Sequence, residues 1–496
     1  MRKRAVSISF TMISTVLLFL ISFSAYGQIT FECCYGGSAR EEGQSVVQCS
    51  DGGYAICGYT KSFSDPIADV YLVRTDEYGD TLWTSCFGGS GYELSYQLEQ
   101  TIDGGFVIAA QSSSYGSADQ MYLVKTDDSG NLQWQRTYGG GYTEKAHSVQ
   151  QTTDNGYIIA GSTNSMGSGG YDMYLVKTDS LGTMEWQRAY GGSGTDRGHN
   201  AVQTFDGGYA IAGYTESWGA GACDVYLVRV DASGDTLWTR TYGGGLEDLT
   251  HYGRCLEQTS DGGFVLTGYT KSFSNGLYDI YLIKTDPLGN LEWQKNFGGS
   301  DMDMGRSVQQ LPDDGYIIGG STKCWGSGLY DVYIVRTNAD GESLWTRTFG
   351  GSGYDYGESV QRTADNGYII GGFTKSFGSG EFDIYMIKME PDTTGIEETN
   401  TRGINQLTVS ICEPNPFSGI MEIDYNLICE CNMHISVFDV HGRMIRMLVD
   451  NMENAGSHTQ VWNGKDDSGN DAASGVYFLR FSTGETSVCR TVCLLR

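Results

Sequence analysis

Three histidines recur at matching points of a repeated pattern in this chain. Gly-Gly pairs come at regular intervals, and the residue type varies at the position seven residues after the second glycine of each pair. The residues at this position are Gln44, Tyr96, His147, His199, His251, Arg306 and Glu358. Because the type changes from copy to copy, the fold does not dictate it. These residues are therefore the candidates for a ligand site.

Two kinds of ligand suit these candidates. Three converging imidazoles are a common ligand set for zinc or copper. A histidine together with Arg306 and Glu358 instead offers the donors and acceptors that bind an anionic or sugar ligand. A third interpretation, which we favour, needs no ligand, because polar side chains also line the wet mouth of a channel. We therefore predict no bound metal and no cofactor.

A carboxylate stands four residues after the second glycine in every copy of the pattern. The seven are Glu41, Glu93, Glu144, Asp196, Asp248, Asp303 and Asp355. Seven carboxylates on one face are suited to Ca²⁺. The alternative is a carboxylate that accepts backbone N–H bonds within a tight loop. We expect the alternative, because a residue present in every copy is most simply explained by the fold.

Other signatures of catalysis are missing from the sequence. It contains no G-x-S-x-G, no H-E-x-x-H and no P-loop motif. We therefore name no catalytic residue and expect a protein that is not an enzyme. The rival hypothesis is a secreted enzyme whose site is built on the variable positions, either with or without a metal ion.

Two further motifs define the elements that position these residues. The pattern D-x-x-G-x-x-x-W occurs at Asp76, Asp127, Asp179, Asp231 and Asp286, with a sixth copy at Asn338. The pattern D-[GND]-G-[YF] occurs seven times, at intervals of 51 to 55 residues. Both are turn chemistry, and the runs between them are rich in Tyr, Ile, Val and Trp, as strands are. Four antiparallel strands in about 52 residues, repeated, predict the blades of a β-propeller.

The two ends of the repeat region predict how the ring closes. The seventh copy has no tryptophan strand after residue 389, whereas residues 29–37 align with residues 82–89 and place Phe31 at the tryptophan position. We expect this N-terminal strand to complete the seventh blade and so to remove an exposed edge. An open solenoid, the rival fold, would instead need polar caps. The prediction is an all-β, seven-bladed β-propeller over residues 28–389.

The repeats resemble known propellers. Residues 350–388 resemble the bacterial β-propeller repeat family with GGSG-x-D and G-Y-T-x-S elements. The D-x-x-G-x-x-x-W pattern is also similar to the tryptophan-docking motif of quinoprotein propellers. The resemblance covers residues 28–389 and implies the fold. It implies no single activity, since propellers host many.

The N-terminus has the layout of a secretory signal peptide. Arg2, Lys3 and Arg4 precede an apolar run at residues 16–23, and small residues come before Gln28. We therefore predict a signal peptide over residues 1–27, cleaved between Gly27 and Gln28, and export through the Sec route to the periplasm. The alternative is an uncleaved membrane anchor. The net charge of −28 excludes nucleic acid as a partner, because an acidic surface repels phosphate backbones.

A different module follows a polar linker at residues 390–405. Alternating runs separated by turns predict a small β-sandwich over residues 406–496. With PNPF at residues 414–417 and GVYF at 475–478, it resembles the type A C-terminal sorting domain of the type IX secretion system. It is also similar to the Ig-like domain of flagellar hook-capping proteins. The resemblance implies passage across an outer membrane by the type IX machinery. The alternative is an Ig-like adhesion module.

The 13 cysteines divide between the two regions. We interpret most of those in the repeats as small buried hydrophobic residues. The best candidates for disulfides, which export permits, lie near the C-terminus. They are Cys429, Cys431, Cys489 and Cys493.

The sequence thus predicts a monomeric protein, secreted or held at the outer cell surface, that binds glycans or other envelope components. The secreted enzyme is the first alternative. A scaffold without any small-molecule site is the second.

Overall fold

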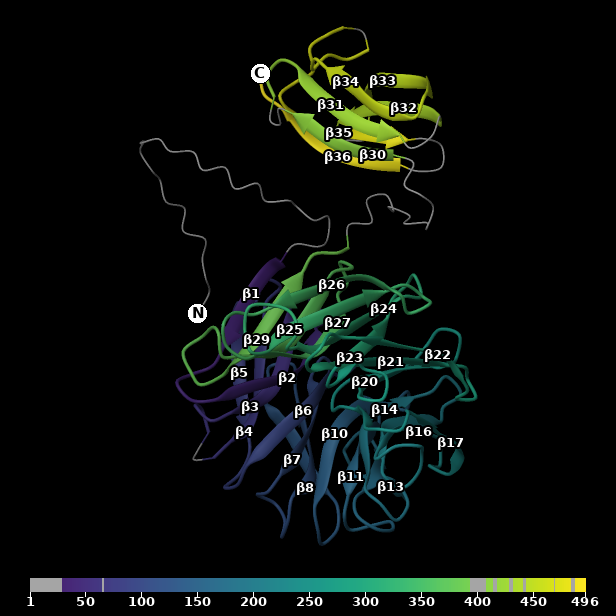
Figure 1. Cartoon of the computed structure of the whole chain (residues 1–496). Helices are drawn as coiled ribbons and strands as arrows, with labels where there is room; N and C mark the ends of the chain where they lie inside the picture. Colours follow the sequence, from purple (N-terminus) through teal and green to yellow (C-terminus); the bar gives the residue numbers. More distant parts are fainter. Residues whose placement is uncertain are drawn as a thin grey trace. The chain divides into compact units, whose positions relative to one another are not determined.

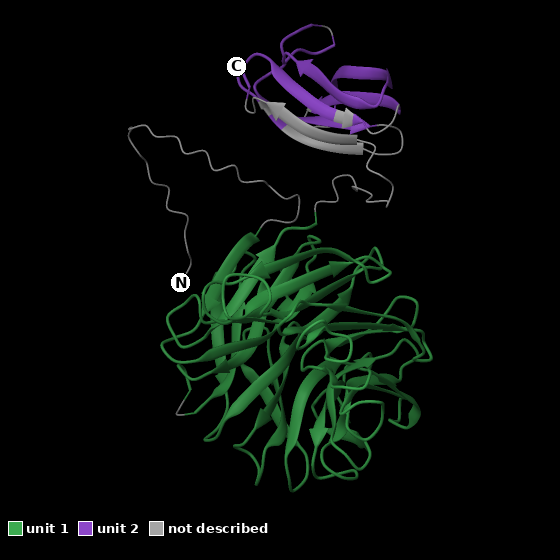
Figure 2. Cartoon of the chain, in the orientation of Figure 1, with its two compact units in different colours: residues 1–393 green, residues 394–496 purple. Residues whose placement is uncertain are grey.

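The structure, a computed structural model, describes residues 29–64, 67–392, 407–413, 417–427, 431–439, 443–467, 469–482 and 487–496. In these ranges the chain is all-β, and none of them holds a helix long and apolar enough to span a membrane. The chain divides into two compact units, residues 1–393 and 394–496 (Figure 2). The predicted signal peptide and most of the predicted linker lie outside the described residues.

The strands of the first unit form seven antiparallel sheets, which we number 1 to 7 (Figure 1). Sheet 1 comprises β2 (Glu41–Gln48), β3 (Tyr54–Thr60), β4 (Asp69–Thr75) and β5 (Thr81–Phe87). Sheet 2 comprises β6 (Glu93–Gln100), β7 (Phe106–Ser112), β8 (Gln120–Thr126) and β9 (Leu132–Tyr138). Sheet 3 comprises β10 (Glu144–Gln151), β11 (Tyr157–Thr163), β12 (Asp172–Thr178) and β13 (Met184–Tyr190).

The remaining four sheets repeat this plan with two variations. Sheet 4 comprises β14 (Asp196–Gln203), β15 (Tyr209–Thr215), β16 (Asp224–Val230) and β17 (Thr236–Tyr242). In sheet 5 the first strand is split into β18 (Asp248–Thr250) and β19 (Leu256–Gln258). The other strands of sheet 5 are β20 (Phe264–Thr270), β21 (Asp279–Thr285) and β22 (Leu291–Phe297). Sheet 6 comprises β23 (Asp303–Gln310), β24 (Tyr316–Thr322), β25 (Asp331–Thr337) and β26 (Ser343–Phe349). Sheet 7 joins β27 (Asp355–Arg362), β28 (Tyr368–Thr374) and β29 (Asp383–Met389) to β1 (Ile29–Tyr35).

The turns between the third and fourth strands form as the Asp-x-x-Gly motif predicts. The Asp76 carboxylate accepts the backbone N–H groups of Tyr78 and Asp80, at 2.9 and 2.8 Å. Gly79 follows with a φ of +79°, a conformation that glycine adopts at little cost. The motif therefore favours the hairpin through hydrogen bonds and a backbone conformation that lie within the turn.

The motif tryptophans join neighbouring sheets. Trp83, on the fourth strand of sheet 1, lies 6.0 Å from the ring of Phe106 in sheet 2. A Cβ atom on Gly130, in the turn of sheet 2, would lie 2.4 Å from the Trp83 ring. Phe31 of β1 lies against Gly79 in the same way, at 2.9 Å. The prediction that Phe31 takes the tryptophan position is therefore confirmed.

Replacing the glycine under a docked tryptophan should destabilise the first unit. The Gly130→Ala substitution places a side chain at φ +78° and against Trp83. Together these should lower the free energy of unfolding by about 2–4 kcal/mol. The matched control is Gly52→Ala, at φ +92° with open space around it, which should cost only about 1 kcal/mol. Denaturant unfolding measures both, and equal losses would contradict the docking role.

Seven hydrophobic clusters fill the spaces between the sheets. Each cluster draws its side chains from two sheets that follow one another in number. The seventh cluster joins sheet 7 to sheet 1, and in it Cys33 and Tyr35 of β1 accompany Ile384 of β29 and Ile56 of β3. The N-terminal strand β1 pairs antiparallel with β29 over its whole length.

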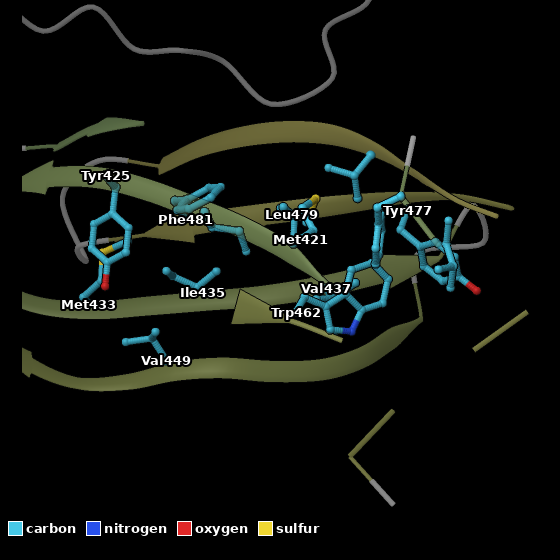
Figure 3. Packing of buried hydrophobic residues seen from close by; sticks show 14 of the residues in the cluster. Met421, Tyr425, Met433, Ile435, Val437, Val449, Trp462, Tyr477, Leu479 and Phe481 are labelled. Carbon is cyan, nitrogen blue, oxygen red and sulfur yellow. The ribbon is translucent and has the colours of Figure 1, made fainter. Parts of the chain in front are cut away.

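The second unit consists of two antiparallel sheets. One contains β30 (Leu407–Glu413), β31 (Met421–Leu427) and β34 (Gly456–Trp462). The other contains β32 (Cys431–Asp439), β33 (Met444–Glu453), β35 (Gly475–Ser482) and β36 (Ser487–Leu494). Side chains from both sheets, among them Trp462, Ile435 and Leu479, form one buried core (Figure 3). The second unit therefore has a hydrophobic core of its own.

The cysteines follow the sequence analysis where the structure describes them. Cys33, Cys49, Cys57, Cys223 and Cys255 are buried in the first unit. Cys429 and the side chains of Cys489 and Cys493 lie outside the described residues, so their pairing stays a prediction.

Candidate functional site

The repeated carboxylates serve the loops between sheets. Glu41 is fully buried and accepts the N–H of Gly37 at 2.8 Å and the hydroxyl of Thr60 at 2.8 Å. The corresponding N–H bonds, all of 2.7–2.9 Å, are Gly89 to Glu93, Gly140 to Glu144, Gly192 to Asp196, Gly244 to Asp248, Gly299 to Asp303 and Gly351 to Asp355. The prediction that these carboxylates hold the loops is therefore confirmed.

The variable positions coincide with β-bulges. In six sheets the register between the first and second strands shifts at this residue, for example between Gly43 and Ser45. A bulge places one extra residue in a strand and turns its side chain in a new direction. In sheet 5, His251 lies in the interruption between β18 and β19 instead. The bulges explain why the residue type is free to vary there.

The three histidines lie together and are buried. His147 and His199 are 1% and 3% exposed, and their ring centroids are 5.5 Å apart. The Nδ1 atom of His147 lies 2.8 Å from the carbonyl of Gly198, and that of His199 lies 2.9 Å from the Thr250 hydroxyl. Burial lowers the pKa of His147 to about 3 and that of His199 well below its usual value. Both imidazoles are therefore neutral at physiological pH.

The three imidazoles surround an aromatic ring. The centroid of the Tyr252 ring lies 4.5 Å from His147, 5.1 Å from His199 and 4.2 Å from His251. Tyr96, the variable residue of sheet 2, lies 5.2 Å from the same ring. No group of three or more His, Cys, Asp or Glu side chains in the described ranges is arranged to hold a metal ion. The three histidines thus pack against the ring of Tyr252.

Burial of His147 as a neutral group makes stability depend on pH. Below pH 6.5 the unfolded chain takes up a proton on this histidine, whereas the folded protein stays neutral there down to pH about 3. Each unit of falling pH therefore lowers the free energy of unfolding of the wild type by about 1.4 kcal/mol through this histidine. The His147→Gln variant has no imidazole at this position and loses nothing in this way. The stability difference between the two proteins should narrow by that amount per unit between pH 6 and 4.5. Urea unfolding at each pH measures it, and a constant difference would contradict the burial.

Arg306 and Glu358 form a second group with His251. The Arg306 Nε atom lies 3.7 Å from a Glu358 carboxylate oxygen, and a terminal guanidinium nitrogen contacts the His251 Nε2 atom. Arg306 is 7% and Glu358 5% exposed. Burial raises the pKa of Glu358 to about 7, although the neighbouring Arg306 opposes the rise. The site residues predicted from sequence thus divide into a histidine–tyrosine group and this charged group.

A pocket of about 500 Å³ opens above the charged group. We call it the mouth pocket, and its lining is Arg40, Glu42, Met304, Arg306, Tyr330, Tyr354, Tyr356, Glu358, Phe373 and Phe382. These residues come from sheets 6, 7 and 1 or from the loops beside them.

Aromatic rings form one wall of the mouth pocket. The rings of Tyr354 and Tyr356 are nearly parallel, 6.2 Å apart at an angle of 6°. Tyr330 lies 5.1 Å and Phe373 4.8 Å from Tyr356. The Arg40 guanidinium lies 4.6 Å above the Phe382 ring. The pocket therefore combines apolar ring faces with buried charged groups.

Sequence reasoning missed this wall and Tyr252. Tyr354 and Tyr356 flank the loop carboxylate Asp355, so a signal existed in the residues beside the repeated acids, which also differ between copies. Tyr330 and Phe382 precede third strands, far from Tyr356 in sequence. Only the arrangement of the sheets brings them together.

Comparison with known proteins identifies the C-terminal region. Residues 414–494 match the family of secretion system C-terminal sorting domains, so the chain carries a type IX sorting domain. No curated protein matches the chain.

Several solved structures are similar to the chain at low sequence identity. PorZ of Porphyromonas gingivalis, described as an essential bacterial surface component of the type IX secretion system, is 12% identical with a TM-score of 0.40 over 90% of this chain. The chain spans 58% of the length of PorZ. A fungal alcohol oxidase of the AA5 family in complex with copper is 10% identical with a TM-score of 0.44, over 95% of this chain and 100% of that one. A puromycin hydrolase is 13% identical with a TM-score of 0.45, over 78% of this chain and 59% of that one.

Proposed function

We propose that the type IX machinery, recognising the sorting domain at residues 414–494, delivers a saccharide-binding protein to the cell surface or the medium. The sorting domain implies the export. Residues 1–27 act as the signal peptide for the preceding Sec step, with cleavage between Gly27 and Gln28. The second unit is an Ig-like sandwich whose role is delivery. The first unit binds the ligand as a monomer.

We further propose that the first unit is a seven-bladed β-propeller closed by β1. Seven sheets of similar plan support the blade number. The pairing of β1 with β29 and the cluster between sheets 7 and 1 support the closure. A closed ring leaves no sheet without a neighbour on either side, and so buries both faces of every second and third strand.

The mouth pocket carries the proposal that the ligand is a saccharide. Sugar rings present an apolar C–H face, which stacks on aromatic rings, and an edge of hydroxyl groups. Tyr354, Tyr356 and Tyr330 offer such rings side by side. Arg306 donates and Glu358 accepts hydrogen bonds beneath them. A ligand that is polar on every side would leave this aromatic wall uncovered.

Charge favours a neutral saccharide. Two positive and two negative side chains line the pocket, so it has no strong preference for one sign. The chain as a whole carries −28, which repels polyanions at a distance. Neutral glycans of an envelope or of the surroundings meet both conditions.

A glycan array with the mature protein tests the proposal. The protein should bind at least one class of neutral saccharide, and Tyr356→Ala should weaken that binding about tenfold, the worth of one stacked ring. The matched control is Tyr142→Ala, which removes an exposed tyrosine outside the pocket and should change nothing. Absence of saccharide binding, or equal affinity in Tyr356→Ala, would contradict the proposed site.

One observation favours a second candidate, a saccharide-cleaving enzyme. A general acid must carry a proton to donate, and Glu358 in the mouth pocket has a pKa raised to about 7, so a large fraction of it is protonated at neutral pH. Reducing-end release from the bound saccharide would reveal cleavage. Glu358→Gln should then abolish release but retain binding. Binding without release supports the first candidate.

A further inference from the structure

The first strand of sheet 5 contains an insertion found in no other sheet of the first unit. In the other six sheets this strand runs unbroken for eight residues, as in β14. In sheet 5, β18 and β19 both pair with β20, and residues 251–255 lie between them. The corresponding interval in the sequence is 55 residues, against 51 or 52 elsewhere. We call residues 251–254 the central plug.

The central plug reaches sheets on one side through Tyr252. Its ring lies 5.2 Å from Tyr96 in sheet 2, 4.5 Å from His147 in sheet 3 and 5.1 Å from His199 in sheet 4. These three partners are the variable residues at the bulges. Their side chains therefore meet the plug.

The central plug reaches two further sheets, 6 and 7, through its backbone. A Cβ atom on Gly253 would lie 3.7 Å from the carbonyl oxygen of Glu358 in sheet 7 and 3.8 Å from that of Arg306 in sheet 6. The N–H of Val308 in sheet 6 donates to the Arg254 carbonyl at 3.0 Å. A segment of sheet 5 thus contacts five other sheets.

The central plug lies next to lining residues of two separate cavities. Arg306 and Glu358 line the mouth pocket. Two residues further along the same strands, Val308 and Val360 line a second cavity of about 130 Å³, together with Arg254 of the plug. The two cavities share no lining residue. Gly253 lies against the carbonyls of Arg306 and Glu358, the two buried charged residues that line the mouth pocket.

We propose that the central plug makes the mouth pocket blind, so that the pocket takes the end of a saccharide chain. This rests on the proposed saccharide function. Arg306 and Glu358 line the pocket and are almost completely buried. The end of a saccharide chain can reach these two side chains by entering the mouth pocket from solvent. An internal segment can lie across the opening, but to bring a sugar ring to these two side chains it would have to fold back within the pocket, because the plug blocks the way through.

Immobilised hexasaccharides test the recognition of chain ends. Maltohexaose, cellohexaose, laminarihexaose and chitohexaose are each coupled through the reducing end to one surface and through the non-reducing end to another. The mature protein should bind the preferred sugar at least about tenfold better in one orientation than in the other. Equal binding in both orientations would overturn the proposal. Absence of binding to every surface would instead overturn the saccharide function on which it rests.

Histidine modification tests the seal without any saccharide. Diethyl pyrocarbonate acylates accessible imidazoles, and peptide mass spectrometry measures the rate at each histidine. His147 and His199 should react at least about tenfold more slowly than the partly exposed His434. Tyr252→Ala should bring their rates close to that of His434. If His147 and His199 react as fast as His434 in the wild type, the plug does not seal the channel.

Discussion

Deletion of residues 29–35 should remove most of the stability of the first unit. The strand β1 pairs with β29 along its length, and Cys33 and Tyr35 are buried in the cluster between sheets 7 and 1. The Tyr35 hydroxyl also donates to the Gly79 carbonyl at 2.8 Å. Loss of each large buried aromatic side chain costs about 3–5 kcal/mol. Total stabilities are only about 5–15 kcal/mol, so the deletion should leave much of the unit unfolded at 25 °C.

Tryptophan fluorescence during urea unfolding measures this effect. Eight of the nine tryptophans belong to the first unit, so the signal reports on it. The control removes residues 396–403 from the predicted linker, which should leave the unfolding midpoint unchanged. If the protein without residues 29–35 unfolds at the same urea concentration as the full chain, β1 does not close the ring.

Truncation after residue 393 should abolish surface delivery while the first unit still folds. The sorting domain occupies residues 414–494 and is what the type IX machinery recognises. All seven clusters between sheets consist of residues from the first unit, so its core needs nothing from the second. The truncated protein should therefore accumulate in the periplasm, with the surface fraction falling to background.

Cell fractionation and protease treatment of whole cells measure the distribution. A point variant tests whether the sorting domain must be folded, and not only present, for delivery to the surface. Trp462 is fully buried in the core of the second unit, and Trp462→Ala should cost about 3–5 kcal/mol there. This full-length variant should also fail to reach the surface. Equal surface display of the truncated and full chains would contradict the sorting role.

The sheets of the first unit were predictable because local chemistry sets each turn. The hydrogen bonds to the Asp76 carboxylate and the positive φ of Gly79 define one hairpin within the turn itself, and β1 of sheet 7 then packs against that turn. The contact of Trp83 with the next sheet recurs at the same spacing in other copies of the repeat, so the repeat period of the sequence predicts it. Repetition thus turns a single local pattern into the whole arrangement.

The candidate site was predictable only in part, because it depends on departures from the repeat. The bulge residues were found by their variation, and Arg306 and Glu358 do line the mouth pocket. A metal was one of the two ligands considered for the three imidazoles, and nothing in the sequence indicated that the Tyr252 ring lies within 4.2–5.1 Å of all three. The insertion was visible as a longer interval in the sequence. The contacts of residues 251–254 with five other sheets depend on packing between sheets, which no local pattern encodes.

The aromatic wall shows the same limit. Tyr354 and Tyr356 are neighbours in sequence, but Tyr330 and Phe382 reach the pocket from loops of different sheets. Their types alone are also those of ordinary strand and core residues. A pocket made across three sheets therefore emerges only once the sheets are assembled.

The structure of the mature protein bound to its preferred hexasaccharide tests the central claim most directly. The account predicts a terminal sugar ring stacked on Tyr356, with its hydroxyl groups within hydrogen-bond distance of Arg306 and Glu358. It also predicts that the chain leaves the pocket toward solvent and stops at the central plug. A saccharide bound elsewhere with the mouth pocket empty, or one that passes the plug into the second cavity, would contradict it.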